Sequence, residues 1–264
     1  MDLRSGPLEE REEQLYQLLD RLREHGDETA AAAVRTVVRD YQDYHRSLYT
    51  RALNQAELFV DESLRAPLLA ALTDTRYNCQ AWAAIGCAAG GFTEAVPALV
   101  YLVDDHDWNV REQAMRALGR LGDATVVPAL APLLGDPQEY TRQHAADALG
   151  EIGGPEALDA LWHEFEHRRF ARIGYVASNL ARFTPEVMPR LEQAITSPDP
   201  NQRYWAAIAL GSTGDERAAP TLEHLMATDH AATVFDGRVD VAAKKALRTL
   251  RRIQTAIAAR SAAG

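Results

Sequence analysis

The chain has 264 residues, enough for one large domain or two small ones with a sizeable core. Apolar residues make up 47% and charged residues 25%, as in ordinary soluble proteins, and the formal net charge of −10 argues against binding to a nucleic-acid backbone. No stretch approaches the roughly 20 apolar residues of a membrane span, and the acidic N-terminus lacks the features of a signal peptide. We therefore expect a cytoplasmic protein with reduced cysteines.

Residues 1–62 do not share the pattern of the following chain, and we expect them to form an N-terminal helical cap. The segment LEEREEQLYQLLDRLREHG places its leucines along one face of an amphipathic helix. A longer helical stretch is expected over 28–60, with Tyr41, Tyr44, Leu48 and Tyr49 at helical spacing. A repeat array needs a cover over its open end, which favours the cap; a partner-binding or dimerisation helix is the alternative.

Residues 63–254 contain a motif that recurs about every 31 residues, and its equivalent positions are Pro97, Pro128, Asp159, Pro189 and Pro220. A shortened earlier copy starts at Pro67, which gives six units. Each unit predicts two helices: the first begins near the proline, and the second ends in Leu-Gly, where we expect the glycine to supply a left-handed stop. One such pair cannot bury its apolar face alone, so the pairs are expected to stack.

The pattern V-P-A-L-x-x-L-x-x-D…V-R-x-x-A-x-x-A-L-G stands almost intact at 96–119 and 127–150. It resembles HEAT-like repeats of the short type found in phycobilisome-lyase-like proteins. The resemblance implies an all-α fold: a right-handed α-solenoid of about six helical hairpins with an N-terminal cap, followed by a C-terminal tail over 255–264. It also implies a ladder between adjacent units, in which an aspartate of the turn meets an arginine of the second helix. Asp105 with Arg111 and Asp136 with Arg142 fit this ladder, whereas Ser197 replaces the acid beside Arg203.

The second helices of such an array usually line its concave face, and polar or aromatic side chains recur there at repeat spacing. Tyr, Trp and Arg are the residue types that carry binding energy at protein interfaces. The candidate binding residues are Gln113, Arg116, Arg120, His144, Asp147, Tyr175, Arg182 and Trp205. The other interpretation is that Tyr175 and Trp205 only pack against the next unit.

These residues favour a non-enzymatic interaction or scaffold protein that binds a protein or peptide on the concave face. The alternative is a phycobilin-lyase-like enzyme or cofactor chaperone that binds a bulky ligand in the same groove. The resemblance does not decide between them, because this architecture also serves scaffolds, chaperones and hydroxylases. The His-Glu pairs that hold iron in deoxyhypusine hydroxylases are replaced by Glu112 with Gln113 and Gln143 with His144. We identify no catalytic set and no cofactor, and if the chain is an enzyme a lyase-like activity is expected.

His163, Glu164 and His167 have the spacing of a zinc-protease motif, and Glu186 could supply a third ligand, so a zinc hydrolase is a minor alternative. The register opposes it, because Glu164 aligns with core leucines of the other units whereas His163 aligns with exposed positions. We predict a buried Glu164, neutralised by Arg168, Arg169 or Arg172, at an irregular joint with an altered stacking angle or a polar seam.

The last part of the chain is strongly basic. Residues 238–260 carry seven lysines and arginines against a single acid, Asp240. Cations suit the last turns of a helix, where they meet unpaired carbonyls, and an anionic partner is the alternative explanation.

Overall fold

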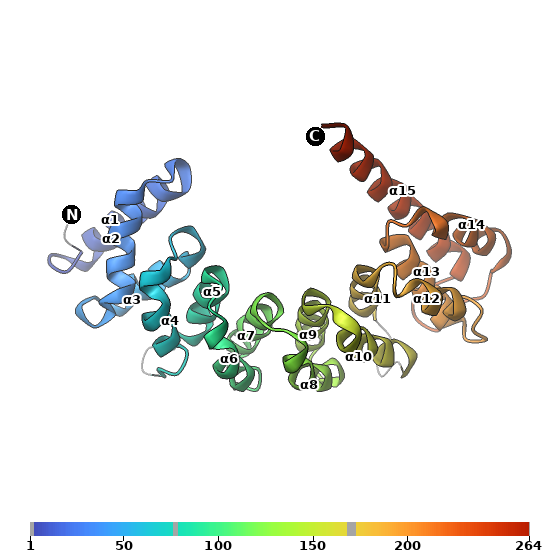
Figure 1. The fold of residues 1–264 in the computed structure, drawn as a ribbon, viewed down its shortest axis with the longest axis horizontal. Helices are drawn as coiled ribbons and strands as arrows, with labels where there is room; N and C mark the ends of the chain where they lie inside the picture. Colours follow the sequence, from blue (N-terminus) through green and yellow to red (C-terminus); the bar gives the residue numbers. More distant parts are fainter. Residues whose placement is uncertain (1–2, 76–78, 168–172, 264) are drawn as a thin grey trace. The chain divides into compact units, whose positions relative to one another are not determined.

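The fold is known from a computed structural model, which describes residues 3–75, 79–167 and 173–263. These residues form α-helices and short 3-10 turns, with one isolated antiparallel bridge between Ala232 and Arg238 (Figure 1). The all-α prediction is therefore confirmed. The chain divides into two compact units, Met1–Gly122 and Asp123–Gly264. Among the described residues, no helix is both long and apolar enough to cross a membrane.

The N-terminal segment forms three helices in the first unit, α1 (Leu8–His25), α2 (Glu28–Arg39) and α3 (Arg46–Leu53). The leucines of α1 are buried, and α1 packs against α2 and α3. The prediction of a long helix over 28–60 is wrong. The chain breaks after α2 into a 3-10 turn, Tyr41–Asp43, and α3 starts anew because His45 Nδ1 accepts a hydrogen bond from the Ser47 N–H at 3.3 Å.

Six helix pairs follow, as the repeat predicted. The first unit holds α4 (Arg65–Ala71) with α5 (Gln80–Gly90), and α6 (Val96–Leu102) with α7 (Trp108–Leu121). The second unit holds α8 (Val127–Leu130) with α9 (Glu139–Ile152), α10 (Gly154–His167) with α11 (Gly174–Leu180), α12 (Met188–Ala194) with α13 (Pro200–Ser212), and α14 (Ala219–Thr228) with α15 (Val239–Ala263). The repeated prolines lie at the first or second position of α6, α8, α12 and α14, where no intrahelical N–H is lost.

The glycine of the repeated Leu-Gly pair does not end the second helix, so that prediction is wrong. Gly150 and Gly211 lie inside α9 and α13, and the positive φ angles occur three residues later, at Gly153 (71°) and Gly214 (72°). A Cβ atom on Gly211 would lie 2.5 Å from the Ala246 Cα atom. The repeated glycine is therefore needed for the close approach of the neighbouring helix.

The arginine of the second helix bonds mainly to backbone of its own unit. Arg142 and Arg203 donate to the carbonyl oxygens of Asp136 (2.8 Å) and Ser197 (2.7 Å). The side chains of Asp136 and Ser197 each accept a hydrogen bond from the backbone N–H two residues on. Because the arginine needs only a carbonyl, serine can replace aspartate in the turn. The expected contact between units is present where Arg203 Nε donates to Asp229 at 2.6 Å.

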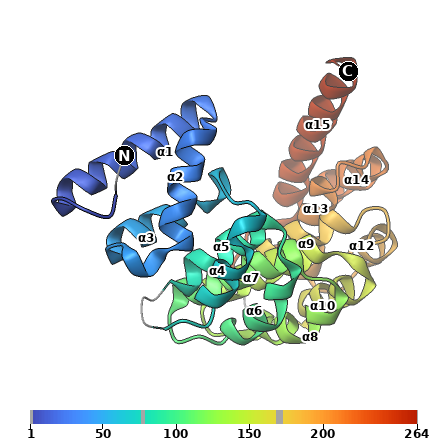
Figure 2. The same cartoon turned by 60° about the vertical axis from the view of Figure 1, so that its left-hand side comes forward.

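Helix α15 is the longest in the described chain. Its first half packs against α13 and α14, whereas every described side chain from Thr255 to Ser261 is exposed. Both views show the end of α15 extending beyond α13 and α14 (Figure 2). The segment expected as a C-terminal tail, 255–264, thus continues α15 as far as Ala263.

Candidate functional site

Three second helices, α9, α11 and α13, pack in succession in the second unit and leave an open groove on their shared surface. The groove has a volume of about 500 Å³. The loop between α14 and α15 reaches over α13 and contributes to one wall. The lining residues are Glu139, Gln143, Asp147, Gly174, Tyr175, Ser178, Trp205 and Asp236.

The two aromatic rings of the groove are held in place by neighbouring units. Trp205 Nε1 donates a hydrogen bond to Asp236 Oδ2 at 3.1 Å, and a Cβ atom on Gly174 would lie 3.2 Å from the Trp205 ring. The Tyr175 hydroxyl accepts a hydrogen bond from Arg142 Nε at 3.2 Å. Both rings are half-buried, so they pack against adjacent units and also present a face to the groove.

Carboxylates give the groove its charge. Glu139, Asp147 and Asp236 line it, and no lysine, arginine or histidine among the described residues does so. The pKa of the Tyr175 hydroxyl is raised, first by burial and further by the charges of Glu164 and Glu139, although the Arg142 guanidinium opposes the rise. The described lining of the groove is therefore acidic.

A buried amide fixes one wall of the groove. Asn179 Nδ2 donates to Asp147 Oδ1 at 2.7 Å and to the Tyr175 carbonyl oxygen at 2.9 Å, and so ties α11 to α9. Arg182 donates to the other atom of this amide, Oδ1, at 3.4 Å. The close packing of Gly150 beneath Asn179 and Arg182 lets this arrangement form.

The structure brings together three of the predicted binding residues, Asp147, Tyr175 and Trp205, in the groove of the second unit. His144 is half-buried on α9, one position from the lining residue Gln143, and Arg182 lies outside the lining set. On α9 the lining therefore includes the predicted Asp147 but holds Gln143 where His144 was expected.

The predicted residues of the first unit lie on α7, where one side chain is buried and two are exposed. Gln113 is only 9% exposed, so its expected place on an exposed surface is wrong; it falls in the buried stripe of α7 with Val110 and Ala117. Arg116 and Arg120 are exposed, and they pair with Glu112 (3.8 Å) and Glu57 (3.1 Å).

Five lining residues are absent from the predicted binding set: Glu139, Gln143, Gly174, Ser178 and Asp236. Glu139 and Gln143 precede Asp147 by eight and four residues, so the helical period along α9 would have found them. Asp236 belongs to the extra residues between α14 and α15, which have no equivalent in the other units. No periodic signal points to this residue.

The His-Glu-x-x-His segment does not form an open metal cleft. Glu164 is 3% exposed whereas His163 and His167 are exposed, as the register predicted. His167 Nδ1 lies 2.8 Å from the His163 carbonyl oxygen, so this nitrogen carries a proton. Glu186 is exposed in the loop before α12, and among the described residues no group of three His, Cys, Asp or Glu side chains is placed to hold a metal ion. A zinc hydrolase needs ligands and glutamate in one cleft, so this geometry does not support it.

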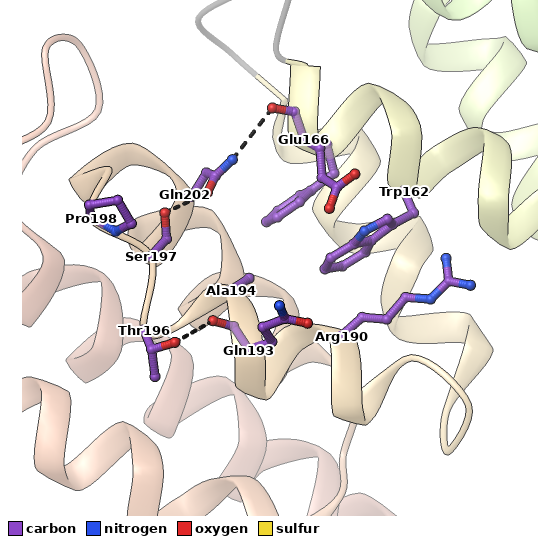
Figure 3. Close-up of a pocket in the computed structure, with 10 residues that line it drawn as sticks. Trp162, Glu166, Arg190, Gln193, Ala194, Thr196, Ser197, Pro198 and Gln202 are labelled. Carbon is purple, nitrogen blue, oxygen red and sulfur yellow. Dashed lines mark hydrogen bonds between the residues drawn. The ribbon is translucent and has the colours of Figure 1, made fainter.

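Polar side chains lie at the joint between α10 and the α12–α13 pair, while the predicted seam around Glu164 stays a prediction. A pocket of about 300 Å³ lies there, with the Trp162 ring and the Arg190 side chain on one side (Figure 3). Gln202 bridges the joint: its amide donates to the Glu166 carbonyl oxygen at 3.4 Å and accepts from Ser197 Oγ at 2.5 Å. The arginines expected to neutralise Glu164, namely Arg168, Arg169 and Arg172, lie outside the described residues.

Three solved structures are among those to which this chain is similar. The chain is similar to solved structures of the CpcE–CpcF complex of phycocyanin lyase from Nostoc sp. PCC7120 (25% identity, 77% of this chain and 89% of that chain, TM-score 0.45) and of YibA from Escherichia coli (18% identity, 89% and 92%, TM-score 0.48). Human deoxyhypusine hydroxylase is also similar (21% identity, 94% and 92%, TM-score 0.36). No curated protein matches the chain.

The family comparison covers well over half of the chain. The family model of HEAT repeats matches residues 65–135, 111–173 and 173–237, which together span α4 to the loop before α15. The helix pairs and their proline starts are those of stacked repeats. The chain is therefore a member of the HEAT-repeat family, with an all-α repeat solenoid fold.

Proposed function

We propose that this chain is a non-enzymatic scaffold that binds a protein or peptide partner in the groove of the second unit. The observation that carries the proposal is the open groove lined by Tyr175, Trp205 and Asp147 on three successive second helices. A stacked repeat offers such a surface as a direct result of its architecture, because each unit adds one helix to it.

The chemistry of the groove suits a polypeptide segment. Rings that are already held by hydrogen bonds lose little conformational freedom on binding, so more of their contact energy appears as affinity. Gln143 and Ser178 add an amide and a hydroxyl that can meet the N–H and C=O groups of an incoming backbone.

The first unit provides supporting roles in this proposal. Residues 1–62 cover the open end of the repeats, since α3 and the Ala56–Leu58 turn pack against α5. Arg116 and Arg120 are exposed in the first unit and are a separate candidate contact for a partner. His144 and Arg182 act at the border of the groove, close to the lining residues Gln143 and Ser178 in sequence.

Site-directed photocrosslinking tests the proposal. A photoreactive residue at Ser178, inside the groove, is expected to capture a discrete partner in cells, and the capture should be lost when Trp205 is also replaced by alanine. The same residue at Thr255, on the exposed end of α15, is the matched control. Circular dichroism confirms that each variant folds. Identical capture from both positions, or capture that survives Trp205→Ala, contradicts the proposal.

A bulky conjugated ligand is the second candidate, because two aromatic faces border the same groove. Co-expression with a bilin pathway tests it: a bound chromophore gives visible absorbance that follows the purified protein. The three carboxylates of the groove disfavour a bilin ligand. Bilins carry propionate groups, which Glu139, Asp147 and Asp236 would repel.

A further inference from the structure

We propose that the groove selects partner segments with an arginine or lysine next to an apolar residue. The inference deepens the proposed function, on which it rests, by naming the chemistry of the partner. It depends on four features of the second unit: the charge of the groove, the positions of the nearest cations, the exposed aromatic faces and the neighbouring loop.

Two carboxylates of the groove accept hydrogen bonds from neutral side-chain donors. Asp147 accepts its hydrogen bond from the Asn179 amide, and Asp236 accepts from the Trp205 indole N–H. Both donors are neutral, so these two hydrogen bonds orient the carboxylates without bringing a positive charge to them. Glu139 stands on the same face of α9 as Asp147 and is exposed.

Among the described residues, two arginines beside the groove, Arg142 and Arg182, are already bonded to groups of the chain. Arg142 is 6% exposed and donates to the carbonyl oxygens of Asp136 (2.8 Å) and Pro137 (3.0 Å), as well as to the hydroxyl of Tyr175. Arg182 is directed to the amide of Asn179. Neither lines the groove, so a cation from a partner would meet carboxylates with no competing side-chain cation of the described chain among the lining residues.

The aromatic faces favour the same kind of ligand. A guanidinium or ammonium group is attracted to the face of a tryptophan or tyrosine ring, and the attraction grows when a carboxylate can bond the same cation. Trp205 and Tyr175 border the groove together with Asp236 and Glu139. Arginine suits this arrangement best, since its planar group stacks and donates in two directions at once.

The loop beside the groove supplies an apolar contact. Val234 and Phe235 are 73% and 76% exposed, and they directly precede the lining residue Asp236. The loop is fixed by hydrogen bonds from the Val234 N–H to Asn201 Oδ1 (3.3 Å) and from the Asp236 N–H to Thr233 Oγ1 (2.8 Å). An apolar partner residue beside the cation would cover these exposed side chains.

Peptide binding tests the inference without knowledge of the natural partner. Three fluorescein-labelled peptides differ only in a central pair, which is Arg-Arg, Gln-Gln or Glu-Glu, followed by leucine. Fluorescence anisotropy with the full chain is expected to show binding of the Arg-Arg peptide at least about tenfold tighter than of the Gln-Gln peptide, and no binding of the Glu-Glu peptide. The affinity should fall as salt rises from about 50 to about 300 mM.

Variants locate the binding. Glu139→Gln, an exposed change with the same shape, is expected to weaken the Arg-Arg peptide about three- to tenfold. Glu216→Gln removes an exposed carboxylate outside the groove of the same unit and should leave binding unchanged. Phe235→Ser should weaken binding of both the Arg-Arg and the Gln-Gln peptide, because both carry the leucine. Equal binding of the three peptides, or equal loss in Glu139→Gln and Glu216→Gln, overturns the inference.

A second copy of this chain is the competing occupant, because the end of α15 exposes Arg251, Arg252 and Arg260. Sedimentation separates the two cases: self-association that is lost in Arg252→Gln and Arg260→Gln would overturn the assignment to a different partner.

Failure of the inference can be distinguished from failure of the proposed function. Capture of an acidic or neutral partner at Ser178 would refute the inference and leave the proposed function standing, whereas arginine selectivity without cellular capture would refute only the proposed function.

Discussion

The repeated Ala-Leu-Gly motif ends in glycine because a neighbouring helix or side chain lies too close for a Cβ atom. The backbone angles of the glycine itself do not require it. In α13, a Cβ atom at Gly211 would lie 2.5 Å from both the Cα and the carbonyl oxygen of Ala246 on α15. In α9, a Cβ atom at Gly150 would meet the side-chain amide of Asn179 and would lie 3.1 Å from Arg182 Cδ. A Cβ atom at Gly211 would meet backbone atoms, whereas one at Gly150 would meet side-chain atoms. Side-chain atoms can shift more easily than backbone atoms, so the two sites differ in how well they can accept a methyl group.

This difference predicts a ranking of two alanine variants. Gly211→Ala is expected to lower the free energy of unfolding by about 1–3 kcal/mol, because overpacking against backbone outweighs the gain in helix propensity. Gly150→Ala should cost less, because side chains can shift where backbone cannot, although a shift of Asn179 weakens its hydrogen bonds to Asp147 and Tyr175. Urea unfolding followed by circular dichroism measures both. A Gly150→Ala variant less stable than Gly211→Ala would contradict the argument.

Buried thiols give a second residue-scale expectation. Burial raises the pKa of Cys79 to about 11 and that of Cys87 to about 12. The thiolate is the reactive form, so at pH 8 both cysteines should react with iodoacetamide far more slowly than a free thiol of pKa about 8.5. Mass spectrometry of the native and urea-unfolded chain checks this. Rapid labelling of the native chain would show that α5 and its N-terminus open readily.

At the scale of elements, an ion pair between Arg203 and Asp229 joins α13 to the end of α14. Arg203 and Asp229 are 16% and 13% exposed in their side chains, and the bond to Arg203 holds the pKa of Asp229 below its ordinary value. Because the folded pKa lies below the unfolded one, the pair stabilises the fold above the unfolded pKa of about 3.9, and this contribution is lost as pH falls through the folded value.

Asp229→Asn tests this contact. The variant should lose about 1–3 kcal/mol of stability at pH 7, and the difference from the parent chain should shrink as pH falls below about 4. Asp159→Asn is the matched control, since its pair with Arg190 is much more exposed (63% and 37%) and should contribute little. Chemical unfolding at several pH values gives both comparisons, and a difference that is constant from pH 7 to pH 3 would refute the assignment.

Helix α15 combines a buried half and an exposed half, and truncation should separate them. Removal of residues from Thr255 onward is expected to change the free energy of unfolding by less than about 0.5 kcal/mol, because the described side chains there are exposed. Removal from Arg248 onward also takes away the fully buried Leu250, so it should cost at least about 2 kcal/mol. Thermal unfolding distinguishes the two truncations, and equal losses would show that the exposed half packs in solution.

The sequence predicted those structural features that recur with the repeat, and it missed a feature that occurs once in the chain. Prolines at constant spacing located the starts of the first helices, and register placed Glu164 in the core. Gln113 was misplaced because register says which helix face a position occupies but not how wide the buried stripe is. Asp236 was missed because its loop occurs once in the chain, so only the folded contact with Trp205 reveals it.

At the scale of the whole molecule, stability in a repeat protein is a sum of local terms, since each unit touches only its neighbours. Gly211 lies in the second compact unit, whereas Met1–Gly122 has a core of its own. Destabilisation at Gly211 should therefore accelerate opening near α13, α14 and α15 more than opening of the first unit.

Hydrogen exchange of the parent chain and Gly211→Ala, read by mass spectrometry at low urea, checks this expectation. We expect faster exchange in peptides from Asp123–Gly264, strongest in α13 and α15, and unchanged exchange in α1, α2 and α5. The Asp159→Asn variant serves as the control, since its exposed ion pair should leave both units unchanged. A uniform increase over both units would mean that the chain opens as one cooperative body, and the description by local repeat terms would then be wrong.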